Sequence, residues 1–241
     1  MTVIRRFDGP EQLAAAAAQY VVDLILEILE ENGLCSLALA GGNTPRATYQ
    51  QVASALRRSS EDLTGLQFYW GDERCVPLDD PESNYRMAAE TMLEPLGVDS
   101  DQVHPIRCGK DAERGANQYE LDLHKAFPDR ELPRFDLVLL GLGEEGHTAS
   151  LFPGSDLIAE SERWVGATFV DKIDAWRVSL TPLAINAAAN VAFLVQGTDK
   201  ADAVRQVIAG DHDPSRWPAQ AIEPADGNLY WFLDKGAARR I

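Results

Sequence analysis

The sequence contains few of the side chains from which metal centres and disulfide frameworks are built. Its four histidines form no HxH or HxxxH pair, and its three cysteines, Cys35, Cys75 and Cys108, form no CxxC pair. Because zinc sites need closely spaced ligands of this kind, we expect no metal site. The odd number of cysteines favours reduced thiols and a cytoplasmic location, since disulfides are rare in cytosolic proteins.

Basic side chains are also scarce. The chain has 22 Lys and Arg against 38 Asp and Glu, which gives a formal net charge of −16. A surface this acidic repels nucleic-acid phosphates and anionic membranes, so neither is expected as a partner. A small anion can still bind where a few Arg or Lys converge in a pocket. We therefore expect a small-molecule partner, and we take a monomer as the default state.

No apolar run is long enough for a membrane span. Asp23 and Glu27 interrupt the Ala-rich stretch near the N-terminus, and no signal-peptide cleavage pattern follows it. Apolar residues in this stretch recur at helical spacing and form one stripe, which predicts a helix over 11–31 on a soluble domain. The pair Asn32-Gly33 that follows is a common helix ending.

Strand-length apolar runs alternate with helical stretches along the 241 residues. Strands are predicted at 2–7, 34–40, 66–70, 135–140, 164–170, 177–180, 191–195 and 229–232. Further helices are predicted at 45–57, 84–93, 111–126, 182–187 and 200–209. The runs 37–40 and 137–140 are apolar at every position, as strands buried on both faces are. These patterns predict one α/β domain over 1–241, with a doubly wound, mainly parallel sheet and helices on both faces.

Ligands of open α/β sheets bind beyond the carboxyl ends of the strands, so the residues that follow strands are the informative ones. Gly41, Gly42, Asn43 and Thr44 follow the strand at 34–40. The glycines allow a close backbone approach, and Thr44 is expected to cap a helix whose free N–H groups favour an anion. The loop fits neither a P-loop nor GxGxxG, so no nucleotide cofactor is expected. A plain strand-to-helix turn is the alternative.

Three consecutive charged residues, Asp72, Glu73 and Arg74, follow the strand at 66–70. The planar guanidinium of Arg74 suits a phosphate group. Asp72 or Glu73 could accept a sugar hydroxyl or fix Arg74 in place. The alternative is a solvated charged loop, and Ser83 could simply cap the helix that begins at Asn84.

The loop after the strand at 135–140 carries the sharpest signal. It is rich in glycine over 141–154, and His147 has the carboxylate of Glu145 two residues before it. Histidine suits proton transfer near neutral pH, and a neighbouring carboxylate can orient its ring and stabilise its charged form. His147 and Glu145 are therefore the candidate catalytic pair. The other three histidines lack such surroundings.

Two cations in the C-terminal third could add to an anion site. Arg177 lies in a strand of mixed polarity, and Lys200 is expected to open a helix after the strand at 191–195. The positive charge of a lysine in the first turn of a helix is unfavourable beside the positive end of the helix dipole. A lysine at that position therefore suggests that an anion binds there. For either residue alone, a plain surface position remains an equal alternative.

Several segments together resemble the 6-phosphogluconolactonase family. They are LALAGGNTP, WGDERCVP with the following SNY, DLVLLGLGEEGHTASLFPG, RVSLTPLAIN and VAFLVQGTDKADAV, and they cover residues 35–210 in the family's order. The most specific of them is GHTASLFPG. The resemblance implies an α/β fold shared with glucosamine-6-phosphate isomerases and deaminases. It also implies hydrolysis of 6-phospho-D-glucono-1,5-lactone to 6-phosphogluconate, the second step of the oxidative pentose phosphate pathway, without a cofactor.

The resemblance also implies roles for individual residues. His147 takes the place of the general base, and Arg74, Lys200 and the loop 41–44 fall on positions associated with phosphate or substrate binding. Arg177 is a further candidate for that group. One departure is Glu145, where the family more usually has aspartate, and the longer side chain leaves its contact with His147 open.

Two other functions fit parts of the same pattern. A glucosamine-6-phosphate deaminase or aldose–ketose isomerase would use a carboxylate base, which Asp72 could supply, but the stretch 149–153 lacks the glutamate expected there. A non-catalytic sugar-phosphate sensor would bind the same ligand without turnover. The acidic charge and the lack of a helix-turn-helix extension are arguments against a sensor of this type.

Overall fold

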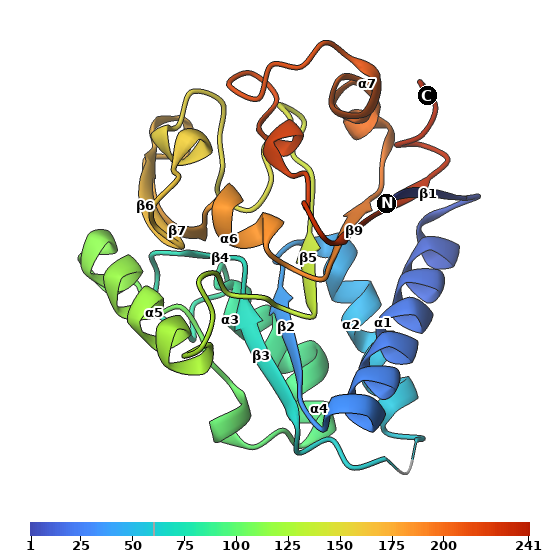
Figure 1. Ribbon diagram of the computed structural model, residues 1–241. Coiled ribbons are helices and arrows are strands. Elements are labelled where there is room, and N and C mark those ends of the chain that lie inside the picture. Colours follow the sequence, from blue (N-terminus) through green and yellow to red (C-terminus); the bar gives the residue numbers. More distant parts are fainter. Residues whose placement is uncertain (60) are drawn as a thin grey trace.

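The computed structural model describes residues 1–59 and 61–241, and a mainly parallel sheet forms its centre (Figure 1). All strand pairs in this six-stranded sheet are parallel, in the order β1-β9-β8-β5-β2-β3. The strands are β1 (Thr2–Phe7), β2 (Cys35–Leu39), β3 (Leu66–Trp70), β5 (Leu137–Leu140), β8 (Asn190–Val195) and β9 (Asn228–Asp234). The predicted α/β class with a mainly parallel sheet is confirmed.

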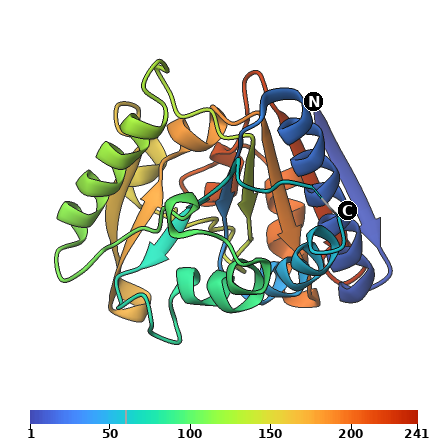
Figure 2. The ribbon, with the colours of Figure 1, turned by 90° about the horizontal axis from the view of Figure 1, so that it is seen from below.

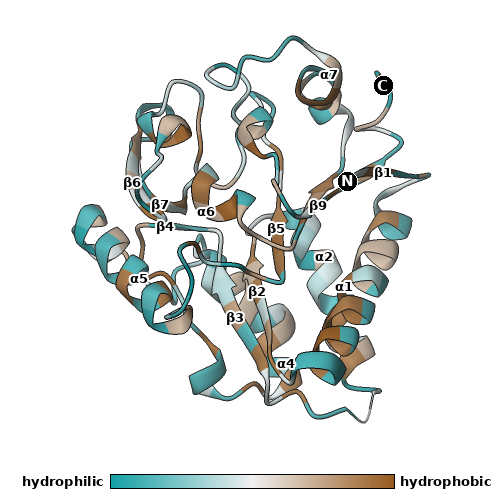
Figure 3. Ribbon diagram, viewed as in Figure 1, coloured by the Kyte–Doolittle hydropathy of each residue, from teal (hydrophilic) through white to brown (hydrophobic). Residues whose placement is uncertain are grey.

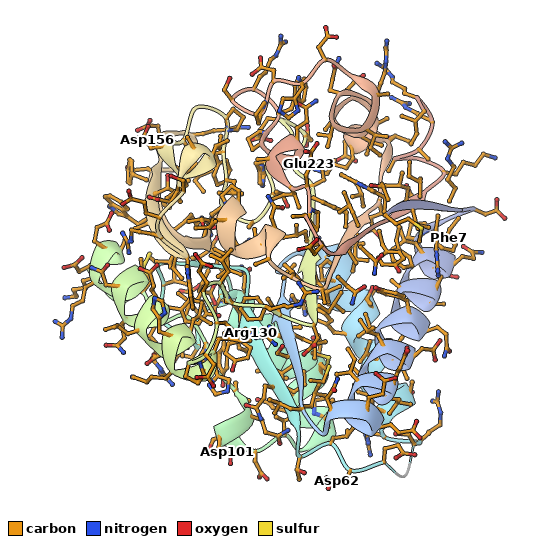
Figure 4. The ribbon with its side chains drawn as sticks, viewed as in Figure 1. Phe7, Asp62, Asp101, Arg130, Asp156 and Glu223 are labelled. Carbon is orange, nitrogen blue, oxygen red and sulfur yellow. A yellow bond between two sulfur atoms is a disulfide. The ribbon has the colours of Figure 1, made fainter. Side chains whose placement is uncertain are left out.

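Burial explains why these segments form the middle of the sheet. Every residue of β2, β5 and β8 is buried. Figure 3 shows apolar residues along these strands and polar residues on the outer turns of the helices. Charged side chains such as Asp62 and Asp101 lie at the end of the molecule where β3 begins (Figure 4). The uninterrupted apolar runs in the sequence therefore do mark strands that are covered on both faces.

Seven α-helices surround the sheet in the described part of the chain. They are α1 (Pro10–Asn32), α2 (Asn43–Leu56), α3 (Asn84–Ala88), α4 (Glu94–Leu96), α5 (Ala112–Ala126), α6 (Pro182–Asn186) and α7 (Ala201–Ala209). Figures 1 and 2 both show α1 and α5 towards opposite edges of the sheet. The helix predicted over 84–93 is divided, because a π-helical turn at Ala89–Leu93 joins α3 to α4.

The expectation that no apolar run is long enough for a membrane span does not hold for helix α1, which is long and apolar enough by length and composition alone. In the structure its apolar stripe packs into the core, with Leu13, Ala17, Val21 and Ile25 all buried. It ends as the sequence predicts, since Gly33 takes a left-handed conformation (φ +69°) and its N–H donates to the carbonyl of Leu29. Glycine adopts this conformation without a steric penalty.

A second, antiparallel sheet lies beside the first, and the sequence analysis did not predict it. It consists of β4 (Asp72–Arg74), β7 (Ala175–Leu180) and β6 (Val165–Val170), in that order. The segment 72–74 was expected to be a loop, which is wrong. It is short and fully charged, so no local pattern marks it as a strand. It becomes one by pairing with β7, about a hundred residues further along the chain, where Arg74 lies opposite Arg177.

The expectation of reduced thiols is also wrong for two of the three cysteines. Cys75 and Cys108 form a disulfide with their Cα atoms 4.9 Å apart, and Cys35 is buried and free. The bridge joins the end of β4 to the segment before α5. The spacing of 33 residues along the chain shows no motif, so only the tertiary fold brings the two side chains together.

Reducing this disulfide is expected to lower the free energy of unfolding by about 3–4 kcal/mol, because the bridge restricts a loop of this length in the unfolded chain. Urea unfolding with and without dithiothreitol measures the change. A Cys75→Ser/Cys108→Ser double variant is the control and should not respond to the reductant. Equal midpoints for the wild-type protein in both conditions would contradict the prediction.

Candidate active site

A cavity of about 560 Å³ opens beyond the carboxyl ends of the parallel strands. Its walls come from the segments that directly follow β2, β3, β5 and β8, as expected for an open α/β sheet. Of the residues singled out in the sequence, eight line it: Gly41, Gly42, Asn43, Thr44, Asp72, Arg74, His147 and Lys200. Glu145 and Arg177 do not line it, but Glu145 lies next to His147 and Arg177 lies opposite Arg74 across β4 and β7.

The glycine loop after β2 has a strict steric requirement. A Cβ atom on Gly41 would lie 1.8 Å from Oδ1 of Asn84, and Gly42 has a φ of +98°. The helix begins two residues earlier than expected, at Asn43, so Thr44 is not its cap. Gly42 holds the cap position, and among the residues that the structure describes no side chain accepts a bond from the first turn of α2. The free N–H groups of that turn can therefore donate to a ligand.

Glu73 organises the second loop from inside the protein. It is 1% exposed, and its carboxylate accepts bonds from the N–H groups of Arg74, Asn84 and Tyr85 at 2.8 Å each and from the Ser83 hydroxyl at 3.0 Å. Burial raises the pKa of Glu73, although these bonds oppose the rise. Glu73 thus fixes the backbone around Arg74 and does not face the cavity.

Asp72 lies on the cavity wall between two donors. Its Oδ2 accepts a bond from the Ser150 hydroxyl at 2.7 Å, and its Oδ1 accepts one from Nδ2 of Asn84 at 3.3 Å. The sequence analysis treated Asn84 only as the start of a helix. That helix does begin there, and Ser83 caps it as suggested, accepting a bond from the N–H of Arg86. The side chain of Asn84 additionally lines the cavity.

The loop after β5 presents His147 to the cavity. A Cβ atom on Gly143 would lie 2.0 Å from Nδ1 of His147, so the ring can pack there only against glycine. The N–H of Gly143 also donates to the His147 carbonyl at 2.8 Å. On another side, the imidazole stacks on Phe152, with ring centroids 4.4 Å apart. Contacts with Gly143 and Phe152, both in the same loop, therefore fix the orientation of the imidazole ring.

Glu145 approaches His147 without forming a hydrogen bond. Its Oε2 lies 3.4 Å from Nδ1, and Nδ1 makes no hydrogen bond to any residue in the described ranges. The other oxygen of Glu145 lies 3.4 Å from Nζ of Lys172. Partial burial raises the pKa of Glu145, but its own N–H and the charges of His147 and Lys172 lower it overall. The interaction with His147 is thus electrostatic in this structure.

Burial keeps His147 neutral over a wider pH range than a free histidine. Desolvation lowers the pKa of its imidazole, while the negative charges of Glu145 and Asp72 oppose that shift. Lys200 adds a smaller lowering effect. A neutral imidazole that faces a cavity can accept a proton, which is what a general base requires.

Two cations border the cavity and a third lies behind it. Lys200 ends a 3₁₀ turn over Thr198–Lys200, so it precedes α7 and does not open it as expected. Its Nζ lies 3.2 Å from Asp199. Arg177, opposite Arg74 across β4 and β7, has buried Nε and Nη1 atoms without a partner among the described residues. Burial, and then the positive charge of Arg74, lower the pKa of Arg177.

Asp234 is a cavity residue that the sequence analysis missed. It ends β9, and its Oδ1 accepts bonds from the N–H groups of Gly197 and Ala237 at 3.1 and 2.7 Å. It thereby holds the turn that carries Lys200. The rule that sites lie at carboxyl ends of strands would have found it, had it been applied to the last strand.

A histidine and two cations around one cavity at this edge of the sheet define an α/β enzyme for an anionic small molecule. The family model described as glucosamine-6-phosphate isomerases/6-phosphogluconolactonase matches residues 8–231, and the chain belongs to this family. A curated protein of Synechocystis named 6-phosphogluconolactonase is 37% identical over 92% of this chain and 90% of its own. Rice relatives described as probable chloroplastic 6-phosphogluconolactonases are 33% identical over 98% of this chain and 75% of theirs.

Solved structures agree with this assignment. The 6-phosphogluconolactonase from Trypanosoma cruzi superimposes with a TM-score of 0.90 at 31% identity and covers all of this chain and 97% of its own. The Trypanosoma brucei enzyme has a TM-score of 0.86 at 33% identity and covers all of this chain and 99% of its own. A monomeric glucosamine-6-phosphate deaminase, at 21% identity and a TM-score of 0.83, shares the fold.

Proposed function

We propose that the protein hydrolyses 6-phospho-D-glucono-1,5-lactone to 6-phospho-D-gluconate, the second step of the oxidative pentose phosphate pathway. The observation that carries this proposal is the placement of His147 in one cavity with Arg74 and Lys200. A phosphorylated lactone needs cations for its phosphate and a base for the attacking water. The relatives named 6-phosphogluconolactonase over nearly the full chain support the same reaction.

In this proposal Arg74, Lys200 and the free N–H groups at the start of α2 hold the phosphate and other oxygens of the substrate. Arg177 adds positive charge behind Arg74. The dianionic phosphate then fixes the lactone ring relative to His147. The proposed steps use no metal or organic cofactor, because His147 activates the water and ester hydrolysis involves neither hydride nor electron transfer.

His147 then moves the proton. Its free ring nitrogen takes a proton from water while the water oxygen attacks the lactone carbonyl carbon and the carbonyl oxygen takes up the negative charge. The tetrahedral intermediate collapses, the bond between this carbon and the ring oxygen breaks, and the imidazolium returns the proton to the departing alkoxide. Glu145 stabilises the imidazolium at that stage by its charge.

The catalysed reaction can be separated from spontaneous lactone opening. Lactone is generated freshly and its hydrolysis is coupled to 6-phosphogluconate dehydrogenase, with the protein-free rate as the reference. Acceleration of the reaction supports the proposal. Ammonia release from glucosamine 6-phosphate would instead favour a deaminase, with Asp72 as its base. Binding of 6-phosphogluconate without any turnover would favour a sensor.

The depressed pKa of His147 predicts the pH dependence of this activity. A general base must be unprotonated, so kcat/KM is expected to fall as the pH drops through the pKa of His147. Because burial lowers that pKa, the acid limb should lie below the ordinary histidine value of about 6.5. A pH–rate profile measures the limb directly. A midpoint above the ordinary value would show that another group controls the activity.

We further propose that the protein acts in the cytoplasm, as a monomer. The net charge of −16 supports this proposal, because nucleic acids and anionic membranes repel a surface this acidic. The Cys75–Cys108 disulfide is the observation that opposes a reducing compartment. Cell fractionation with rapid alkylation of free thiols tests the location and the state of the cysteines together. Light scattering after size exclusion measures the oligomeric state.

A further inference from the structure

A single hydrogen bond joins the loop of His147 to the strand of Asp72. The hydroxyl of Ser150 donates to Oδ2 of Asp72 at 2.7 Å, and Ser150 is 1% exposed. Among the described residues, no other hydrogen bond connects the segment 71–86 with the segment 141–154. The N–H of Ser150 also donates to Oγ of Ser179, which pairs with Asp72 across β4 and β7, so the backbone positions are fixed separately and the hydroxyl bond acts on the orientation of the Asp72 carboxylate.

The backbone before Ser150 takes an unusual conformation. Ala149 has a φ of +46°, in the left-handed region that residues with a Cβ atom seldom adopt. Two bonds maintain the turn around it: the Thr148 hydroxyl donates to the Gly141 carbonyl at 2.8 Å, and the N–H of Leu151 donates to the Thr148 carbonyl at 2.9 Å. The turn directs Ser150 to Asp72 while His147, three residues earlier, lines the cavity.

The charged groups around His147 make the position of Asp72 matter. Glu145 faces the imidazole from its own loop, Asp72 faces it from β4, and Lys200 faces it from the turn before α7. Lys172 acts on it through Glu145. Asp72 thus acts on His147 from a different element than Glu145, and the bonds from Ser150 and Asn84 control its orientation. The other carboxylates on the cavity wall have partners of their own, since Asp199 pairs with Lys200 and Asp234 accepts bonds from the N–H groups of Gly197 and Ala237.

We propose that Ser150 is a positioning residue, whose hydroxyl holds the Asp72 carboxylate in one orientation and so sets the negative charge that His147 faces. This inference rests on the proposed function, in which His147 is the base. The hydroxyl partly neutralises the carboxylate and keeps its Oδ2 atom directed at Ser150. Without it, only the longer bond from Asn84 restrains the carboxylate, whose charge is less neutralised and stabilises a protonated His147 more strongly.

NMR titration of the histidine ring protons tests this role directly, and the resonance missing in His147→Ala identifies His147. In Ser150→Ala the pKa of His147 is expected to rise by about half a unit. The acid limb of kcat/KM should move up with it, so that kcat/KM well below the limb falls about 3-fold, whereas kcat at neutral pH changes less than about 2-fold and KM changes little, because the imidazole stays mostly neutral there. A general loss of structure would lower kcat at every pH but would leave the pKa of His147 unchanged.

The chain contains a matched control at another site. The hydroxyl of Ser36, which is 6% exposed, donates to Oδ2 of Asp136 at 2.7 Å, and neither residue lines the cavity. Ser36→Ala removes the same kind of bond and should lower the melting temperature comparably, yet leave the His147 titration unchanged. An unchanged titration in Ser150→Ala, or an equal shift in both variants, would overturn the proposal.

A second variant keeps the test decisive if Ser150→Ala fails to fold. Asp72→Asn removes the charge, so the pKa of His147 should fall, and no change in it would overturn the proposal. The two hypotheses fail in different ways. If the wild-type protein does not accelerate lactone hydrolysis, the proposed function fails. If it does, but the His147 titration is the same in wild type and Ser150→Ala, only the role of Ser150 fails.

Discussion

Replacing His147 by alanine is expected to lower kcat by roughly 10²–10⁴-fold, the range typical for loss of a general base, with a much smaller change in KM. The ring packs against Gly143 and Phe152 inside the cavity, and burial favours its neutral form. Alanine leaves the water without a proton acceptor. The phosphate contacts proposed for Arg74 and Lys200 are untouched, so substrate binding should persist.

The coupled lactone assay measures this change, with circular dichroism to verify that the variant is folded. His212→Ala is the matched control, because His212 is exposed and does not line the cavity. That variant should keep the wild-type kcat. A His147→Ala protein with turnover close to wild type would remove His147 from the mechanism and leave the base to be found elsewhere.

Replacing Arg74 by alanine is expected to raise KM for the phosphorylated lactone by about 10- to 100-fold, with a smaller effect on kcat. A hydrogen bond to a charged group contributes about 1.5–3 kcal/mol, which corresponds to this range. Arg74 lines the cavity, and the bonds that Glu73 accepts fix its backbone. The neighbouring Arg177 retains part of the positive charge, which limits the loss.

The unphosphorylated glucono-1,5-lactone makes the test specific for the phosphate. Arg74→Ala should alter its hydrolysis little, since the missing guanidinium has no phosphate to bind. Arg86→Ala is the control arginine, because its guanidinium pairs with Glu90 at 2.6 Å outside the cavity. A KM that stays at the wild-type value for the phosphorylated substrate would show that Arg74 does not bind its phosphate.

The sequence by itself determined the parallel sheet and the place of the site. Continuous apolar runs such as 37–40 can be satisfied only by strands covered on both faces, and Gly33 ends α1 because a left-handed residue was needed there. Once the strands were assigned, parallel pairing alone placed the segments that carry Gly41, Arg74 and His147 at one edge. These are local signals, readable within about ten residues.

Only the tertiary structure decided which groups touch. The strand 72–74 exists because it pairs with β7, and Cys75 meets Cys108 for the same kind of reason. Ser150 bonds to Asp72 across 78 positions of the chain. The separation of 3.4 Å between Glu145 and His147 depends on how their loop is packed. Periodicity and propensity report the burial of a residue and the conformation of its own backbone. They carry no information on which distant side chain fills the space beside it.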